Sequence, residues 1–134
     1  MNMVFSIEEI NAIVKYRVEK ADTAFIEEKD NANLNHWTLT ANRLYYACFH
    51  ISTALLLKNG YVSNTHLGTI SLICQHFVEK GLLLAEDARM LSKLMNMRTS
   101  GDYTDFFEYT ENDISPLFKP VEDYISKVKN LINR

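Results

Sequence analysis

The sequence predicts an all-α protein, an antiparallel up-and-down bundle of about five helices. Apolar residues recur at steps of three and four along most of the 134 residues, which is the spacing of one face of an α-helix. Only four glycines and two prolines interrupt these runs, so we expect long helices joined by short loops. No stretch alternates as a strand would, and one domain over residues 1–134 accounts for the length.

The first helix is predicted to begin at Ser6. Ser6 and Glu9 have the spacing of a capping box, in which the hydroxyl and the carboxylate each accept a backbone N–H. We expect the helix to end before a polar connection at residues 27–35. Its apolar face is formed by Ile7, Ile10, Val14, Val18, Ala21 and Phe25.

The second helix is predicted to span Trp37–Lys58. It is apolar on almost every side, which is typical of the central helix of a bundle. Asn59 and Gly60 form a good C-terminal stop, because glycine tolerates the left-handed conformation of a helix cap. A third helix is expected over His66–Lys80, and Gly81 ends it.

The fourth helix is predicted over Ala85–Arg98, followed by a turn at Gly101. The last helix contains Pro116 and Pro120, and a proline inside a helix costs about 3 kcal/mol and kinks it. The helical phase survives both prolines, so we expect an irregular start and a regular finish. The residues in phase are Ile114, Leu117, Val121, Tyr124, Val128 and Leu131.

Charge and composition exclude several classes of protein. The net charge of −3 and the pI of about 5.8 argue against a general nucleic-acid binder, which would be basic, but they allow a small basic site. Cys48 and Cys74 lie in apolar helical patterns and read as buried reduced thiols, as in a cytoplasmic protein. Neither a signal peptide nor a run of about 18 apolar residues is present, so we expect no membrane segment.

A polar stripe crosses the apolar second helix. Arg43, Tyr46 and His50 are spaced so that they share one helix face, and each needs a partner or a cavity there. Two interpretations are open. The stripe is either a set of satisfied polar groups at an interhelical seam, or one wall of a polar site.

A second polar group follows the fourth helix. In one interpretation Arg98 binds a phosphate with its fixed fork of donors, and Asp102 or Tyr103 orients it. In the other, Asp102 pairs with Arg98 or caps the next segment, and Tyr103 packs on the end of the bundle. In an up-and-down bundle this group could meet the polar stripe of the second helix.

The remaining candidate residues carry weaker signals. His66 and His76 read as structural, and no spacing of His or carboxylates suggests a metal site, so we expect neither metal nor cofactor. The aromatic run Phe106, Phe107 and Tyr109 is most simply core or dimer interface, with base stacking as the alternative.

Three segments, Asn42–His50, Gln75–Gly81 and Met97–Phe106, resemble the HEPN domain proteins (higher eukaryotes and prokaryotes nucleotide-binding). They occur in the family's order with plausible spacing. The resemblance implies an α-helical bundle that is commonly dimeric. Prokaryotic members often pair with a small nucleotidyltransferase, and many act as RNA-cleaving toxins.

The chain departs from the catalytic motif of that family, an R-x4-6-H pair. Arg98 matches the arginine, but Tyr103 stands in place of the histidine, and no His follows Arg98. Histidine moves protons near neutral pH, whereas a tyrosine with an ordinary pKa of about 10 does not. Arg43 and His50 also match the R-x4-6-H spacing, but they lie on a different helix from the family's pair.

The resemblance therefore implies a HEPN-like nucleotide- or RNA-binding interaction protein, a homodimer that acts with a nucleotidyltransferase partner in a toxin–antitoxin-like pair. The predicted binding residues are Arg43, Tyr46, Arg98 and Asp102. The alternative is a metal-independent ribonuclease toxin in which Arg98 works with His50 or Tyr103. The sequence leaves open whether the protein is an enzyme.

Overall fold

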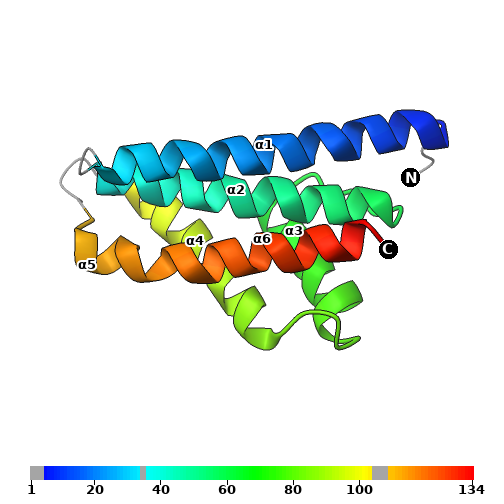
Figure 1. The fold of residues 1–134 in the computed structure, drawn as a ribbon. Helices are drawn as coiled ribbons and strands as arrows, with labels where there is room; N and C mark the ends of the chain where they lie inside the picture. Colours follow the sequence, from blue (N-terminus) through cyan, green and yellow to red (C-terminus); the bar gives the residue numbers. More distant parts are fainter. Residues whose placement is uncertain (1–4, 34–35, 104–108) are drawn as a thin grey trace.

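The structure is a computed structural model that describes the backbone of residues 5–33, 36–103 and 109–134, and the side chains of residues 5–27, 36–98 and 109–134. These ranges contain helices and no strand, which confirms the predicted all-α bundle (Figure 1). The α-helices are α1 (Ile7–Asn33), α2 (Trp37–Lys58), α3 (His66–Ile73), α4 (Ala85–Tyr103), the single turn α5 (Glu111–Ile114) and α6 (Phe118–Ile132).

Helix α2 lies at the centre of the bundle, where α1, α4 and α6 all pack on it. Twelve of its 22 residues are buried, so it is covered on more than one side, as its apolar sequence predicts. Helices α1, α2 and α6 lie side by side, with α1 antiparallel to α2 and α6 running in the direction of α2 (Figure 1). Helix α4 crosses them at a steeper incline.

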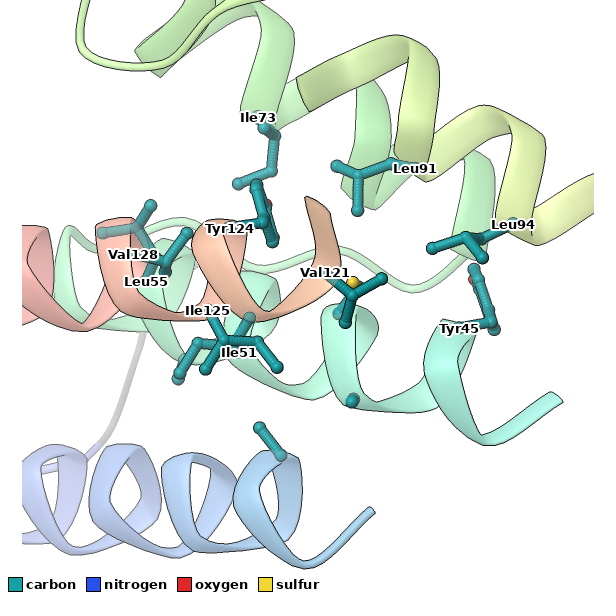
Figure 2. Close-up of a cluster of buried hydrophobic side chains, with 14 of the residues drawn as sticks. Tyr45, Ile51, Leu55, Ile73, Leu91, Leu94, Val121, Tyr124, Ile125 and Val128 are labelled. Atoms are coloured by element: carbon teal, nitrogen blue, oxygen red, sulfur yellow. The ribbon is translucent and has the colours of Figure 1, made fainter. Parts of the chain in front are cut away.

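The hydrophobic core forms where α2, α3, α4 and α6 meet (Figure 2). Large side chains from all four helices interdigitate there, and Leu55, Ile73 and Leu94 are fully buried. Helix α1 contributes smaller residues, Val14, Ala21 and Ala24. Ile7 of its predicted apolar face is 78% exposed, so the burial of α1 begins further along the helix.

Among the described residues, the buried side chains of Thr40, Ser52, Thr69 and Asp87 all make hydrogen bonds, which removes the cost of burying them unpaired. The Ser52 and Tyr124 hydroxyls are 2.6 Å apart and join α2 to α6. The Asp87 carboxylate accepts from Lys127 Nζ at 2.9 Å and caps the start of α4 by accepting from the Leu84 N–H, also at 2.9 Å. These contacts fix α6 against both α2 and α4.

Several predicted helix ends are confirmed. The Ser6 hydroxyl accepts from the Glu9 N–H at 3.1 Å, and the Glu9 carboxylate accepts from the Ser6 N–H at 3.3 Å. Helix α2 has the predicted bounds. Gly60 and Gly81 follow their helices with φ of +85° and +77°, a region that a residue with a Cβ rarely adopts.

Three predicted boundaries are wrong. Helix α1 continues to Asn33, through most of the polar connection expected at residues 27–35. Helix α4 continues to Tyr103, so Gly101 lies inside a helix and makes no turn. Glycine in a helix costs only about 1 kcal/mol relative to alanine, and polar residues form helices readily, so neither feature ends a helix that the rest of the fold supports.

The third error concerns α3, which ends at Ile73 instead of Lys80. Residues Cys74–Val78 continue as a π-helical turn that buries Phe77. Both cysteines are free thiols, but only Cys48 is fully buried, and Cys74 in this turn is half-buried. Single π-helical turns of this kind are rare and occur mostly as bulges within helices.

The irregular start of the last helix is confirmed. After α5, residues Ser115–Leu117 form a 3-10 turn that contains Pro116, and α6 begins at Phe118. Pro120 is the third residue of α6, where the backbone N–H lacks an intrahelical acceptor in any helix. Both prolines thus lie where they cost little.

The buried hydroxyl pair provides a test of this packing. We expect Tyr124→Phe to lower the free energy of unfolding by about 1–3 kcal/mol, because it leaves the Ser52 hydroxyl buried without a partner. Ser52→Ala combined with Tyr124→Phe should cost less than the sum of the two single changes. Urea denaturation followed by circular dichroism measures all three, and simple additivity would contradict the contact.

Candidate functional site

Arg98 on α4 reaches across to α2, where it meets two tyrosines. Its Nη1 donates a hydrogen bond to the Tyr46 hydroxyl at 3.2 Å. The centre of the guanidinium lies 5.5 Å from the ring centroid of Tyr45 and 5.7 Å from that of Tyr46, within the range of a cation–π contact. The structure therefore brings Arg98 together with Tyr46, two candidate residues that are 52 positions apart.

Tyr45 lies beneath this arginine and links it to a histidine. Its ring is buried, and its hydroxyl is 2.5 Å from Nδ1 of His66. Burial raises the pKa of Tyr45 to about 12, although Arg98 acts in the opposite direction. The phenol therefore stays neutral at physiological pH and can share a proton with the imidazole.

His66 is the first residue of α3, and its ring packs on Phe49 with centroids 4.5 Å apart. Thr65 caps the helix and accepts from the Gly68 N–H at 2.8 Å, which fixes the backbone beside the histidine. Burial and the charge of Arg98 lower the pKa of His66, so the neutral imidazole is favoured. The sequence predicts only a structural role for His66, because its partner Tyr45 is 21 positions away and no motif joins them.

The other members of the α2 stripe point to different partners. Arg43 Nε is 3.4 Å from a carboxylate oxygen of Glu27 on α1. The His50 ring lies 6.0 Å from the Tyr46 ring but opens toward α1, where it lines a pocket with Arg17 and Lys20. Burial and the charges of Lys20, Arg17 and Arg43 lower the pKa of His50. The stripe is thus an interhelical seam at Arg43 and part of polar sites at the other two positions.

Some predicted site residues lie outside the described part of the chain. Asp102 and Tyr103 belong to the backbone of α4, but their side chains are not among the described ones, and Phe106 and Phe107 are outside it altogether. Tyr109 is described. Its hydroxyl donates to the Met97 carbonyl at 2.9 Å, and its N–H donates to the Thr38 hydroxyl at 3.1 Å. Tyr109 therefore ties the segment before α5 to α4 and to the start of α2.

His76, which the sequence predicts to be structural, stacks its ring on the ring of Tyr61, with centroids 3.9 Å apart.

Within the described ranges, no group of three or more His, Cys, Asp or Glu is placed to hold a metal ion. None of the helices there combines the length and the apolar character needed to cross a bilayer.

Comparison with known proteins identifies the fold. The sequence profile described as HEPN domain matches residues 14–131, which include α2, α3 and α4 in full and all but the last residue of α6. The chain belongs to the HEPN domain family. Arg98, Tyr45, Tyr46 and His66 all lie inside the matched region.

Curated relatives of this HEPN protein cover most of its length. A UPF0332 protein of Archaeoglobus fulgidus is 31% identical over 121 residues, which is 90% of this chain and 96% of the relative. A UPF0332 protein of Thermotoga maritima is 29% identical over 91 residues, 68% of this chain and 69% of the relative. A protein of Methanocaldococcus jannaschii that is named "Putative toxin" is 27% identical over 125 residues, 93% of this chain and 90% of the relative.

The electrostatic contact between Arg98 and His66 can be tested directly. We expect Arg98→Gln to raise the pKa of His66 toward its ordinary value, because a positive charge that opposes protonation is removed. The measurement is NMR titration of the imidazole carbons. Lys93→Gln, on the exposed side of α4, serves as the control and should leave His66 unchanged. An unaltered His66 titration in the Arg98 variant would show that the two groups are further apart than the structure places them.

Proposed function

We propose that this HEPN protein is a nucleotide- or RNA-binding interaction protein that acts in the cytoplasm with a nucleotidyltransferase partner, as a toxin–antitoxin-like pair. The observation that carries the proposal is the Arg98 guanidinium, held against the rings of Tyr45 and Tyr46 by a hydrogen bond and two cation–π contacts. Membership of the HEPN domain family and the name of the Methanocaldococcus jannaschii relative support a nucleotide- or RNA-related role.

The chemistry of this cluster suits a phosphodiester ligand. A guanidinium presents its donors in a rigid fork that matches phosphate oxygens, and a tyrosine face can stack on any base. Tyr46 is half-buried, so its ring keeps a face at the surface. The binding roles of Arg43 and Asp102 stay predictions from the sequence.

Two further parts of the proposal concern partners. The buried core of a protein–protein interface is more apolar than the rest of the surface. This chain exposes several large apolar side chains, including Ile7 at 78%, Leu67 at 65% and Ile26 at 61%. These side chains are available to the core of such an interface.

RNA binding tests the proposal. We expect Arg98→Ala to weaken binding of a fluorescein-labelled single-stranded RNA by about 10- to 100-fold in fluorescence anisotropy, because a charge-assisted hydrogen bond contributes about 1.5–3 kcal/mol. Arg89→Ala is the matched control, since Arg89 is an exposed arginine of the same helix that pairs only with Glu86 among the described residues. Equal affinity of the folded Arg98 variant and the wild type would refute the site.

A metal-independent ribonuclease toxin is the second candidate function. Arg98 would stabilise the charge that develops on the phosphate, with His50 or Tyr103 in the acid–base role. His50 lines the pocket on the α1 side. His66 favours this candidate more directly, because its hydrogen-bond partner Tyr45 lies under Arg98.

An RNA cleavage assay in EDTA separates the two functions. The interaction protein should bind RNA and leave it intact. A ribonuclease should cut it, and both Arg98→Ala and His66→Gln should then slow cleavage by at least about 100-fold, the size of effect typical of a proton-transfer group. Cleavage by the wild type that Arg98→Ala abolishes would replace the interaction proposal with the enzymatic one.

A further inference from the structure

A second polar site lies on the other side of α2, facing α1. A pocket of about 360 Å³ is lined by α1, the second half of α2 and the loop that follows α2. Arg17 and Lys20 line it from α1, and His50 lines it from α2. Its floor is apolar and includes the buried side chains of Leu56 and Leu57.

Helix packing holds the cationic groups of this pocket in place. Arg17 is half-buried, and its Nη1 donates to the Thr53 carbonyl of α2 at 3.3 Å. Burial lowers the pKa of Arg17, but a guanidinium stays charged at any physiological pH. One turn further along α1, Lys20 Nζ lies 5.4 Å from the centroid of the Tyr16 ring. Two cations and one imidazole therefore converge on the same space.

The pairing of charges elsewhere makes this convergence unusual. Arg43 forms an ion pair with Glu27 of α1. Lys129 forms another with Asp22 of α1, at 2.6 Å. In contrast, no Asp or Glu of the described residues pairs with Arg17 or Lys20. Packing brings these two cations together without an ion-pair partner among the described residues, so the pocket carries a local positive field that an anion would relieve.

The size and the lining of the pocket indicate which anion fits. Its volume lies within the range of small-molecule sites, about 300–1,000 Å³, and is larger than a bare phosphate requires. The aromatic rings of Tyr16, Phe49 and Tyr61 stand beside the cationic groups. A ligand that fills both parts has a phosphate at one end and a flat, partly apolar group at the other.

We propose that this pocket binds a nucleoside monophosphate group, with its phosphate on Arg17, Lys20 and His50 and its base against the aromatic side chains. The group can belong to a free nucleotide or to the end of an RNA chain. This site is distinct from that of Arg98. Tyr46 separates the two, since its hydroxyl accepts from Arg98 while its ring faces His50 at 6.0 Å.

Isothermal titration calorimetry with AMP, GMP, CMP and UMP tests the proposal. At least one of them should bind, and adenosine or inorganic phosphate should bind at least about tenfold more weakly than AMP if AMP is that ligand, because each fills only part of the pocket. Lys20→Gln and His50→Gln should each weaken nucleotide binding at least about tenfold. Lys20 is exposed, so its replacement leaves the fold intact.

A control variant makes the outcome specific. Lys15→Gln changes an exposed lysine of the same helix outside this pocket, so it should bind nucleotide as the wild type does. The proposal is overturned if none of the four nucleotides binds, if inorganic phosphate binds as tightly as they do, or if Lys20→Gln and His50→Gln keep wild-type affinity. Loss of RNA binding in Arg98→Ala alone bears only on the proposed function.

Competition between bound nucleotide and RNA identifies the source of the nucleoside monophosphate group. A short RNA with a 5′-phosphate that displaces the bound nucleotide, when the same RNA with a 5′-hydroxyl does not, assigns the pocket to RNA ends. Displacement by free nucleotides alone assigns it to a small-molecule ligand. Either result supports the proposal, because both place a nucleoside monophosphate on Lys20 and His50.

Discussion

The burial of α2 is the constraint on which the rest of this structure depends. Helices α1, α3, α4 and α6 all pack on it, and fully buried residues recur along its whole length, from Ala41 to Leu56. A helix covered on so many sides leaves room for polar side chains only at the seams between neighbours, where a partner or a cavity is at hand. Tyr46 lies at the seam with α4, and His50 lies at the seam with α1.

These seams explain why one helix serves two polar sites. Tyr45 and Tyr46 are adjacent in sequence and so project about 100° apart around the helix axis. Tyr45 turns into the bundle and meets His66, whereas Tyr46 stays at the surface. Arg98 bridges both rings from α4. The arginine is therefore positioned by the core itself, since its aromatic contacts belong to the most buried helix.

Periodicity and caps predicted much of this fold, because they depend on neighbours in sequence. The bounds of α2 and the Ser6 capping box follow from such local signals. The continuation of α4 through Gly101 does not, because whether one glycine ends a helix depends on what the helix packs against. The same distinction between local signals and long-range contacts applies to the residues of the site. Arg98 stands out in sequence, but the roles of His66 and Arg17 arise from contacts to Tyr45 and Thr53 that span 21 and 36 positions.

The net negative charge limits how this protein can attract nucleotides, so the local cationic groups matter more. A chain with a net charge of −3 gains little from diffuse attraction to phosphates, so any recognition of nucleotides must come from a few fixed contacts. Ion pairs such as Lys127 with Asp87 neutralise cations elsewhere on the described surface. Arg17 and Lys20 form no ion pair with the described residues, and the α2 residues that face them, Thr53 and His50, carry no negative charge. Selective binding in an acidic protein then requires the geometry seen here, in which packing against α2 holds a cation beside an aromatic ring.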